Sequence, residues 1–263
     1  MRSSVVFWAL VLILVGVLLL LGNLGIVSVS WNLIWPLLVV AAGVWFLWGA
    51  LAKPDRVEVR EAAIPLEGAK RARVRISHGA GRLQLAAGTV PDQIASGSFG
   101  GGLDYRAQRD GEKLNLKLRV PERVFDWPWG TSGALDWSFG LNREIPLELK
   151  LKIGSGEAGI DLTDLLVTDL ELDTGVSSTR LTLPAHAGFT RARIKLGVAS
   201  LKIRVPDGVA LRLRTQNTPL AGVTVDPLRF PGGGNLHQSP EYDAAPNKID
   251  MDVETGVGSV DVR

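Results

Sequence analysis

A glycine-rich corner recurs along the part of the chain after residue 52, each time between stretches in which apolar and charged residues alternate. The middle corners begin at Gly154, Gly175, Gly197 and Pro219, a spacing of 21 to 22 residues. Alternation with a period of two predicts half-buried strands. A fixed period of about 20 to 30 residues built from short strands predicts stacked β coils, each covering its neighbour's apolar face. The corners occupy residues 77–85, 154–162, 174–183, 196–205, 218–225 and 255–262.

The alternating stretches indicate that everything after Ala52 is all-β, because no long stretch there has helical periodicity. We expect a stacked, β-solenoid-like repeat module in two parts, an N-terminal part at 53–145 and a C-terminal part at 146–263. The predicted strands include "RVRI" (73–76), "LNLKLRV" (114–120), "LELKLKI" (147–153), "LKIRV" (201–205), "LRLR" (211–214) and "IDMDV" (249–253).

One corner also matches the dinucleotide-binding pattern G-x-G-x-x-G, at Gly154, Gly156 and Gly159. That fingerprint needs a helix directly after the glycines, because the helix N-terminus holds the pyrophosphate. The residues that follow are "IDL", which read as a strand. The glycines are therefore expected to serve a tight corner, and no nucleotide or other cofactor is predicted here.

Residues 3–52 contain no Asp, Glu, Lys, Arg or His. Two apolar runs, 5–21 and 33–51, are each long enough for one membrane crossing of about 20 residues. We therefore expect an α-helical transmembrane hairpin at 1–52. A cleaved signal peptide ending near Ser30 is the alternative, although the second run would then still remain as an anchor.

The placement of basic residues predicts the orientation of this hairpin. Arg2 precedes the first run, Lys53, Arg56 and Arg60 follow the second, and the connecting turn has neither Lys nor Arg. The positive-inside rule then places both ends of the hairpin, and the β module with them, on the cytoplasmic side of the plasma membrane.

Two insertions interrupt the strand pattern, at 125–140 and 226–247. The first holds Trp127, Trp129 and Trp137 among proline and glycine. It is either a contact loop for a partner or the membrane interface, or a cap over one end of the stacked coils. We expect Trp137 to be buried and the other two tryptophans to be more exposed.

A run of basic residues alternates with apolar ones in the region 191–214. If these residues share one face, they form a cationic patch suited to anionic headgroups; otherwise they belong to ordinary solvated strand faces. They are Arg191, Arg193, Lys195, Lys202, Arg204, Arg212 and Arg214.

No catalytic residue, metal site or nucleic-acid partner is predicted. Acidic residues at 161, 164, 169 and 173 could in principle pair for glycoside cleavage, but turn and strand-edge roles are the commoner use of Asp. The three histidines lie far apart without ligand spacing, and there are no cysteines. The net charge of +2 says little about partners.

The segment 16–48 resembles the LiaI–LiaF-like transmembrane hairpin. The matching positions are Gly16, Leu19, Leu20, Asn23, Gly25, Trp35, Pro36, Leu37, Leu38 and Gly43. The T-G-x-x-S-x-x-L-x-L corners resemble the toast-rack β domains of LiaF-like proteins.

This resemblance implies a non-enzymatic, membrane-anchored binding or regulatory protein of the bacterial envelope-stress response, with a partner such as a membrane sensor kinase. The alternative is a self-associating, membrane-tethered β scaffold with a structural role.

Overall fold

The computed structural model describes residues 35, 36, 39, 40, 43, 59–121, 135–217 and 220–263. The chain divides into two compact units, Met1–Asp55 and Arg56–Arg263. The predicted hairpin lies outside the described residues, apart from five helical positions in its second run. Within the described residues, no helix is both long enough and apolar enough to cross a membrane.

The described residues of the second unit form strands, turns and loops without a helix, which agrees with the predicted all-β module. Its strands are β1 (Val59–Pro65), β2 (Arg71–Ala87), β3 (Gln93–Gly100), β4 (Asp104–Asp110), β5 (Lys113–Arg119), β6 (Trp137–Leu141), β7 (Leu147–Asp161), β8 (Val167–Thr182), β9 (Phe189–Arg204), β10 (Ala210–Asn217), β11 (Ala221–Val225), β12 (Gly232–Gly233), β13 (Leu236–Gln238) and β14 (Lys248–Val262).

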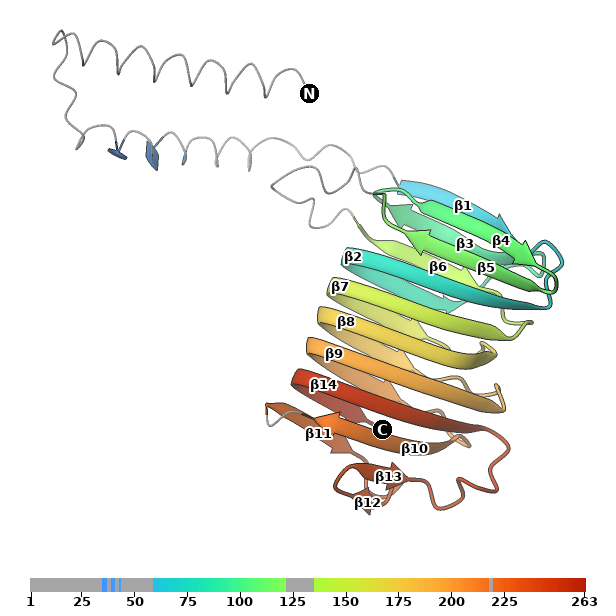
Figure 1. The fold of residues 1–263 in the computed structure, drawn as a ribbon, viewed down its shortest axis with the longest axis vertical. Helices are drawn as coiled ribbons and strands as arrows, with labels where there is room; N and C mark the ends of the chain where they lie inside the picture. The colour runs from blue at the N-terminus through green and yellow to red at the C-terminus, as the bar shows by residue number, and fades with distance from the viewer. Residues whose placement is uncertain (1–34, 37–38, 41–42, 44–58, 122–134, 218–219) are drawn as a thin grey trace, which may run out of the picture. The chain divides into compact units, whose positions relative to one another are not determined.

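Five strands, β2, β7, β8, β9 and β14, are unusually long because each bends at its glycine corner and continues into a second layer. In β9 the buried side chains are at even positions up to Leu196 and at odd positions from Ala199 onward. This one-residue change of phase keeps the apolar side chains facing inward on both sides of the bend. The long strands are stacked in parallel, and the core lies between the two layers (Figure 1).

Glycine is required at the corners because successive corners lie directly against one another. A Cβ atom on Gly154 would lie 2.2 Å from the carbonyl oxygen of Gly79, and one on Gly175 would lie 2.5 Å from that of Gly154. Gly156 also has a φ of 121°, a conformation that L side chains rarely adopt. All three glycines of the G-x-G-x-x-G motif lie within strand β7, so the pattern reflects corner geometry and not a loop before a helix.

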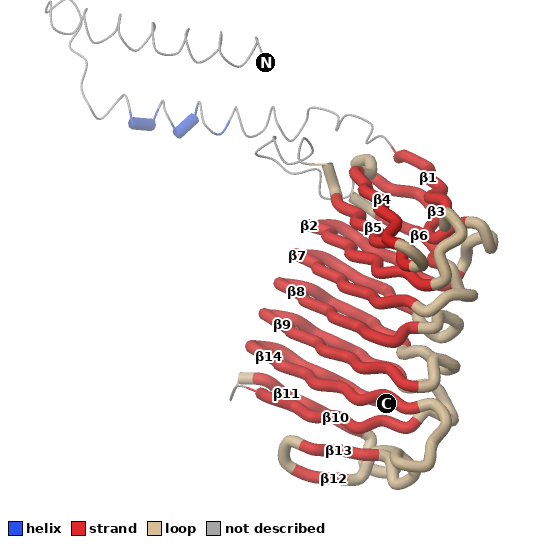
Figure 2. The backbone as a smooth tube through the Cα atoms, turned by 45° about the vertical axis from the view of Figure 1, so that its right-hand side comes forward, coloured by secondary structure: helices blue, strands red, loops and turns tan. Residues whose placement is uncertain are grey.

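The strands do not stack in sequence order. The order is β2-β7-β8-β9-β14-β10, so the last strand of the chain is inserted between β9 and β10 (Figure 2). The regular spacing of Gly197 and Pro219 suggested that these corners are neighbours, but Gly256 stacks on Gly197 instead. The 226–247 insertion supplies the chain length for this return.

The insertion at 226–247 also covers the edge of β10. Its strand β13 pairs antiparallel with β10, and β12 pairs with β13. Phe230 and Tyr242 from the same insertion are buried. The end of this layer is therefore closed by a hairpin and aromatic side chains, the role that the sequence suggested for the other insertion.

The insertion at 125–140 is only partly a departure from the strand pattern. Its last residues belong to β6, which pairs parallel with β2 and antiparallel with β3. The interruption of the strand pattern predicted for 125–140 therefore ends at Trp137, where the sheet resumes. Trp137 begins β6 because its neighbours alternate buried and exposed positions, which is typical of a strand.

The sheet is continuous across the proposed boundary between residues 145 and 146. β2 pairs with β7 along both layers, from Ala72 with Leu147 to Leu85 with Ile160. In one layer the sheet continues past β6 with β3 and then β1. In the other layer it continues past β2 with β5 and then β4. Arg56–Arg263 is accordingly one compact unit.

Candidate functional site

The outer face of one layer carries charged side chains in rows, one row per strand. Each outward position on β9 is in register with an outward position on β8 and on β14. The sign of the charge alternates from strand to strand. The acidic rows are Asp169, Glu171 and Asp173 on β8 and Asp250, Asp252 and Glu254 on β14, and the basic row between them is Arg191, Arg193 and Lys195.

These rows bear on the two interpretations of the basic run at residues 191–214 and favour ordinary solvated strand faces over one cationic patch. The basic row of β9 lies between two acidic rows, and Lys195 forms an ion pair with Glu254 at 2.9 Å. On β10, Arg214 contacts Asp250 at 2.6 Å and Asp252 at 2.7 Å. Parallel pairing joins segments that are distant in sequence, so a run of like charges along the chain is neutralised across strands.

The remaining predicted basic residues lie elsewhere. Lys202 and Arg204 follow the bend of β9 and are therefore exposed on the outer face of the other layer. Arg212 on β10 contacts Asp243 at 3.3 Å and has its guanidinium 4.1 Å from the ring centre of Tyr242. The seven residues thus divide between two faces.

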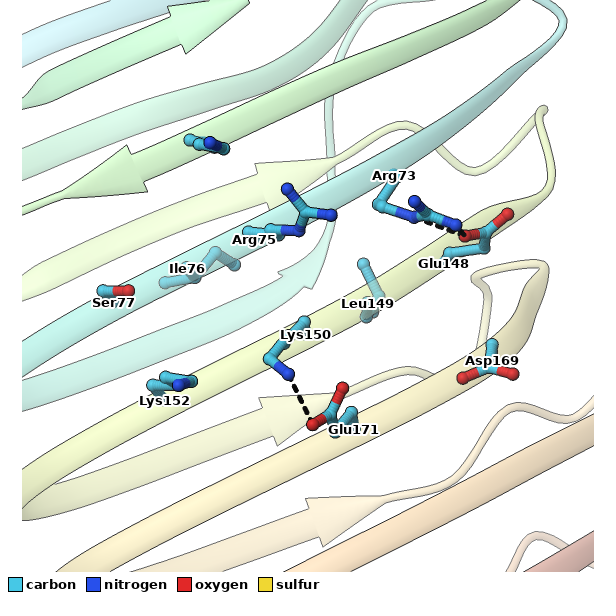
Figure 3. Close-up of a pocket in the computed structure, with 11 residues that line it drawn as sticks. Arg73, Arg75, Ile76, Ser77, Glu148, Leu149, Lys150, Lys152, Asp169 and Glu171 are labelled. Atoms are coloured by element: carbon cyan, nitrogen blue, oxygen red, sulfur yellow. Dashed lines mark hydrogen bonds and ion pairs between the residues drawn. The ribbon is translucent and has the colours of Figure 1, made fainter.

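A hollow of about 560 Å³ lies on the charged face over β2, β5, β7 and β8 (Figure 3). At its edge Glu148 accepts hydrogen bonds from Arg73 and Lys113, each at 2.6 Å. Burial alone would raise the pKa of Glu148, but the bonds from Lys113 and Arg73 outweigh it and hold the pKa below the ordinary value. Lys150 is hydrogen-bonded to Glu171 on the neighbouring strand.

Three basic residues on adjacent strands of the sheet lie side by side in this hollow. Arg75 on β2 is directly opposite Lys117 on β5 and Lys150 on β7. Lys152 lies on the same outward face of β7, and in Figure 3 neither it nor Arg75 is joined to a neighbour. Like charges directly opposite one another are unfavourable in a sheet. These opposed basic side chains give the hollow an excess of positive charge beside the acidic row of β8. We call it the cationic hollow.

The sequence alone did not single out the cationic hollow. Arg75, Lys117 and Lys152 each occupy the charged position of an alternating stretch, as many residues of this chain do. What distinguishes them is the pairing of β2 with both β5 and β7, which brings together residues from three separate stretches. No local sequence pattern predicts that pairing.

Trp137 belongs to the segment named as a candidate partner or membrane contact, but it is buried in the core, as we expected for this one of the three tryptophans. Its exposed fraction is 1%, and its Nε1–H donates to the carbonyl oxygen of Gly100 at 3.1 Å. The indole ring meets Phe99 edge to face, with ring centres 5.1 Å apart. A side chain so enclosed offers no contact surface. Trp127 and Trp129 lie outside the described residues.

The acidic cluster has structural roles. Asp161 accepts hydrogen bonds from the backbone N–H and the hydroxyl of Thr163, at 3.0 and 2.6 Å, which is typical of an Asx turn. Asp169 and Asp173 belong to the acidic row of β8. Within the described part of the chain, no group of His, Cys, Asp and Glu side chains is arranged to hold a metal ion.

The comparisons with known proteins agree with this architecture. No curated protein matches the chain. A crystal structure described as that of a candidate cell adhesion protein from Clostridium sporogenes ATCC 15579 is similar in fold. Its TM-score is 0.70 at 19% sequence identity, covering 78% of this chain and 98% of that one.

Two family models match the sequence itself. Residues 6–47 match the LiaI-LiaF-like transmembrane region, which supports a membrane protein. Residues 53–204, more than half of the chain, match the N-terminal domain of toast_rack, DUF2154. The glycine-cornered, stacked β module thus has its counterpart in a recognised family, and the chain belongs to the LiaF-like toast-rack family.

Proposed function

We propose that this protein is a membrane-anchored, non-enzymatic regulator of envelope-stress signalling. In this proposal the toast-rack unit binds an acidic segment of a membrane partner, such as a sensor kinase, in the cationic hollow. The match to the LiaI–LiaF-like transmembrane region supports the membrane association. We further propose that the N-terminal hairpin spans the membrane twice and that the β unit is cytoplasmic.

The observation that carries the proposal is the row Lys117–Arg75–Lys150 on three paired strands. Of these three, Lys150 is engaged by Glu171. The backbone of Arg75 lies between those of Lys117 and Lys150, at the strand spacing of about 4.8 Å, with all three side chains on the same face. An acidic side chain of a partner would relieve the repulsion between these like charges. The neighbouring acidic row of β8 would then favour partners that also present a basic residue, because complementary charges determine specificity.

The roles of the acidic residues support a non-enzymatic function. Glu148 is bound by two cations, and Asp161 is bound within a turn. The two cations hold the pKa of Glu148 below its ordinary value. Glu148 is therefore a poor candidate for a general acid, which needs a raised pKa.

The test places a photo-crosslinking residue at Ser77, on the rim of the hollow, in the full chain within native membranes. A control chain carries it at Thr182, on the other layer. We expect a crosslinked partner from position 77 that is lost when Arg75 and Lys117 are both changed to Glu. The same double variant should alter the envelope-stress reporter response as deletion of the protein does, at unchanged abundance.

The proposal would be wrong if the crosslinks were equal at both positions, or if the charge-reversed chain restored the reporter response of a deletion strain. A reporter response that is unaffected by deletion would refute the regulatory role while leaving binding testable by the crosslink alone. The two parts of the proposal can therefore fail separately.

The scaffold alternative is favoured by one observation. Within the described residues β11 pairs only with β14, so its outer edge offers unpaired backbone groups to another strand. A second copy adding a strand there would lengthen the stack. Crosslinks confined to pairs of this chain, together with large assemblies in size-exclusion chromatography, would support that function; a monomer would exclude it.

A further inference from the structure

The outer face of the second layer differs in charge from the face that carries the cationic hollow. Over the strand halves that follow the bends of β8 and β9, the outward side chains include no acidic residue. The outward side chains there are hydroxyl-bearing or basic. They are Ser178, Arg180 and Thr182 on β8 and Ser200, Lys202 and Arg204 on β9.

Arg180 and Lys202 lie directly opposite each other in the register of β8 and β9. A pair of like charges at this position is unfavourable and would normally be separated by an acidic row, as it is on the other face. Asp261 of β14 lies on the other side of Lys202. Its two carboxylate oxygens, however, accept from the guanidinium of Arg263, at 3.1 and 2.5 Å.

These residues line a groove of about 490 Å³, which we call the β8–β9 groove. Arg229 is held at its side by the carbonyl oxygens of Val205 and Pro206, at 2.9 and 3.1 Å. The lining contains five basic side chains and two acidic ones. The basic side chains are Arg180, Lys202, Arg204, Arg229 and Arg263, and the acidic ones are Asp207 and Asp261.

We propose that the β8–β9 groove binds a phosphate-bearing anion. Arginine and lysine supply charge-assisted donors that suit phosphate oxygens, and the bidentate geometry of arginine suits them best. Thr182, which also lines the groove, adds a neutral hydroxyl donor beside the cations. A bound phosphate could contact both Arg180 and Lys202 and so offset the repulsion between them.

This site is separate from the cationic hollow, because the two lie on the outer faces of different layers. The chemistry also differs. The lining of the hollow includes three acidic side chains, two of them from the acidic row of β8, whereas the lining of the groove includes two, of which Asp261 is bound by Arg263. The anion could be the headgroup of an anionic lipid or a soluble phosphate compound, and the test separates these sources.

The first arm uses the full chain in micelles of an uncharged detergent, titrated with inorganic pyrophosphate by calorimetry. The test variant changes Arg180, Lys202 and Arg204 to Gln. The matched control changes Arg191, Arg193 and Lys195 to Gln, which removes the same charge from the acid-flanked row of β9. We expect the test variant to lose affinity by about tenfold or more and the control by no more than about twofold.

The second arm places the full chain in phosphatidylcholine nanodiscs and measures the binding of added vesicles. Vesicles with phosphatidylglycerol should bind more than pure phosphatidylcholine vesicles if the ligand is a lipid headgroup. Binding in the pyrophosphate arm alone indicates a soluble ligand. The proposal is overturned if neither arm shows binding, or if both triple variants lose binding equally, since that would be a non-specific effect of net charge.

The test variant relieves a like-charge contact, so it should fold at least as well as the unchanged protein. A second variant guards against a folding artefact. Lys202→Glu places a carboxylate opposite Arg180 and should abolish binding without lowering the melting temperature. Retained binding in this variant would also overturn the proposal.

Discussion

His78 and Trp137 meet edge to face in the core, with ring centres 5.3 Å apart and an angle of 61° between the planes. The Nε2–H of His78 donates to the carbonyl oxygen of Leu135 at 2.7 Å, so the second ring nitrogen carries no proton in the neutral form. That nitrogen, Nδ1, has no partner among the described residues. Burial lowers the pKa of His78, while the bond to Leu135 and the charge of Asp136 oppose the shift.

This histidine should make the β unit less stable in mild acid. Its pKa is lowered on folding, so the unfolded chain binds the proton more readily. The free energy of unfolding should therefore be highest above about pH 6.5, the pKa of histidine in the unfolded chain. It should fall as the pH is lowered from about 6.5 toward the pKa of His78 in the folded protein. Urea denaturation at a series of pH values between 7.5 and 5 (roughly the titration range of histidine) measures this slope.

The variant His78→Gln keeps a donor for Leu135 but does not titrate in this range. We expect it to be less stable at neutral pH and to show a flatter dependence on pH between about 7 and 5. An unchanged slope would show that another group controls the acid sensitivity.

Trp137→Ala should destabilise the unit by about 3 to 5 kcal/mol, because the change removes a fully buried ring and leaves a cavity. The loss of its hydrogen bond to Gly100 adds to this cost. Tyr105→Ala is the control, since Tyr105 is an aromatic residue with 44% of its surface exposed; its effect should stay within about 0.5 kcal/mol. Equal effects in chemical denaturation would contradict the burial of Trp137.

Gly156→Ala should destabilise the unit by about 1 to 3 kcal/mol or more, through backbone strain and a steric clash. The new Cβ would lie 2.0 Å from the carbonyl oxygen of Gly81. Gly222→Ala is the matched control, because nothing lies within 4 Å of its Cβ position. Thermal melts of both variants test the corner, and a saturable shift of the unchanged protein with NAD or ATP would show that the motif binds a nucleotide after all.

The orientation of the β unit is testable with fusions after Arg263. The basic residues around the two apolar runs predict that a cytoplasmic reporter is active there and that alkaline phosphatase is not. An active alkaline phosphatase fusion would place the β unit outside. It would also make a cytoplasmic domain of a sensor kinase impossible as the partner of the cationic hollow.

The sequence was sufficient for much of the fold, because its signals are local. Alternation of apolar and charged residues is typical of a strand, and the predicted stretches at 73–76, 114–120, 147–153, 201–205, 211–214 and 249–253 all lie in strands except for Val120 and Val205, which directly follow strand ends. The glycines mark the corners for an equally local reason, since a bend that stacks on another bend has no room for a Cβ atom. The burial of Trp137 also followed from the alternation of its neighbours.

Tertiary structure decided which strands are neighbours, and with that the electrostatics of both faces. The basic run from Arg191 to Arg214 occupies one stretch of the chain, but the insertion of β14 between β9 and β10 places acidic residues in register with all of its members except Arg204. They are Arg191, Arg193, Lys195, Lys202, Arg212 and Arg214. The pairing of β8 with β9 also leaves Arg180 opposite Lys202, which lies one repeat further along the chain. β14 reaches its place beside β9 only after the intervening strands β10 to β13, so this pairing is selected by packing of the whole sheet and not by any local motif.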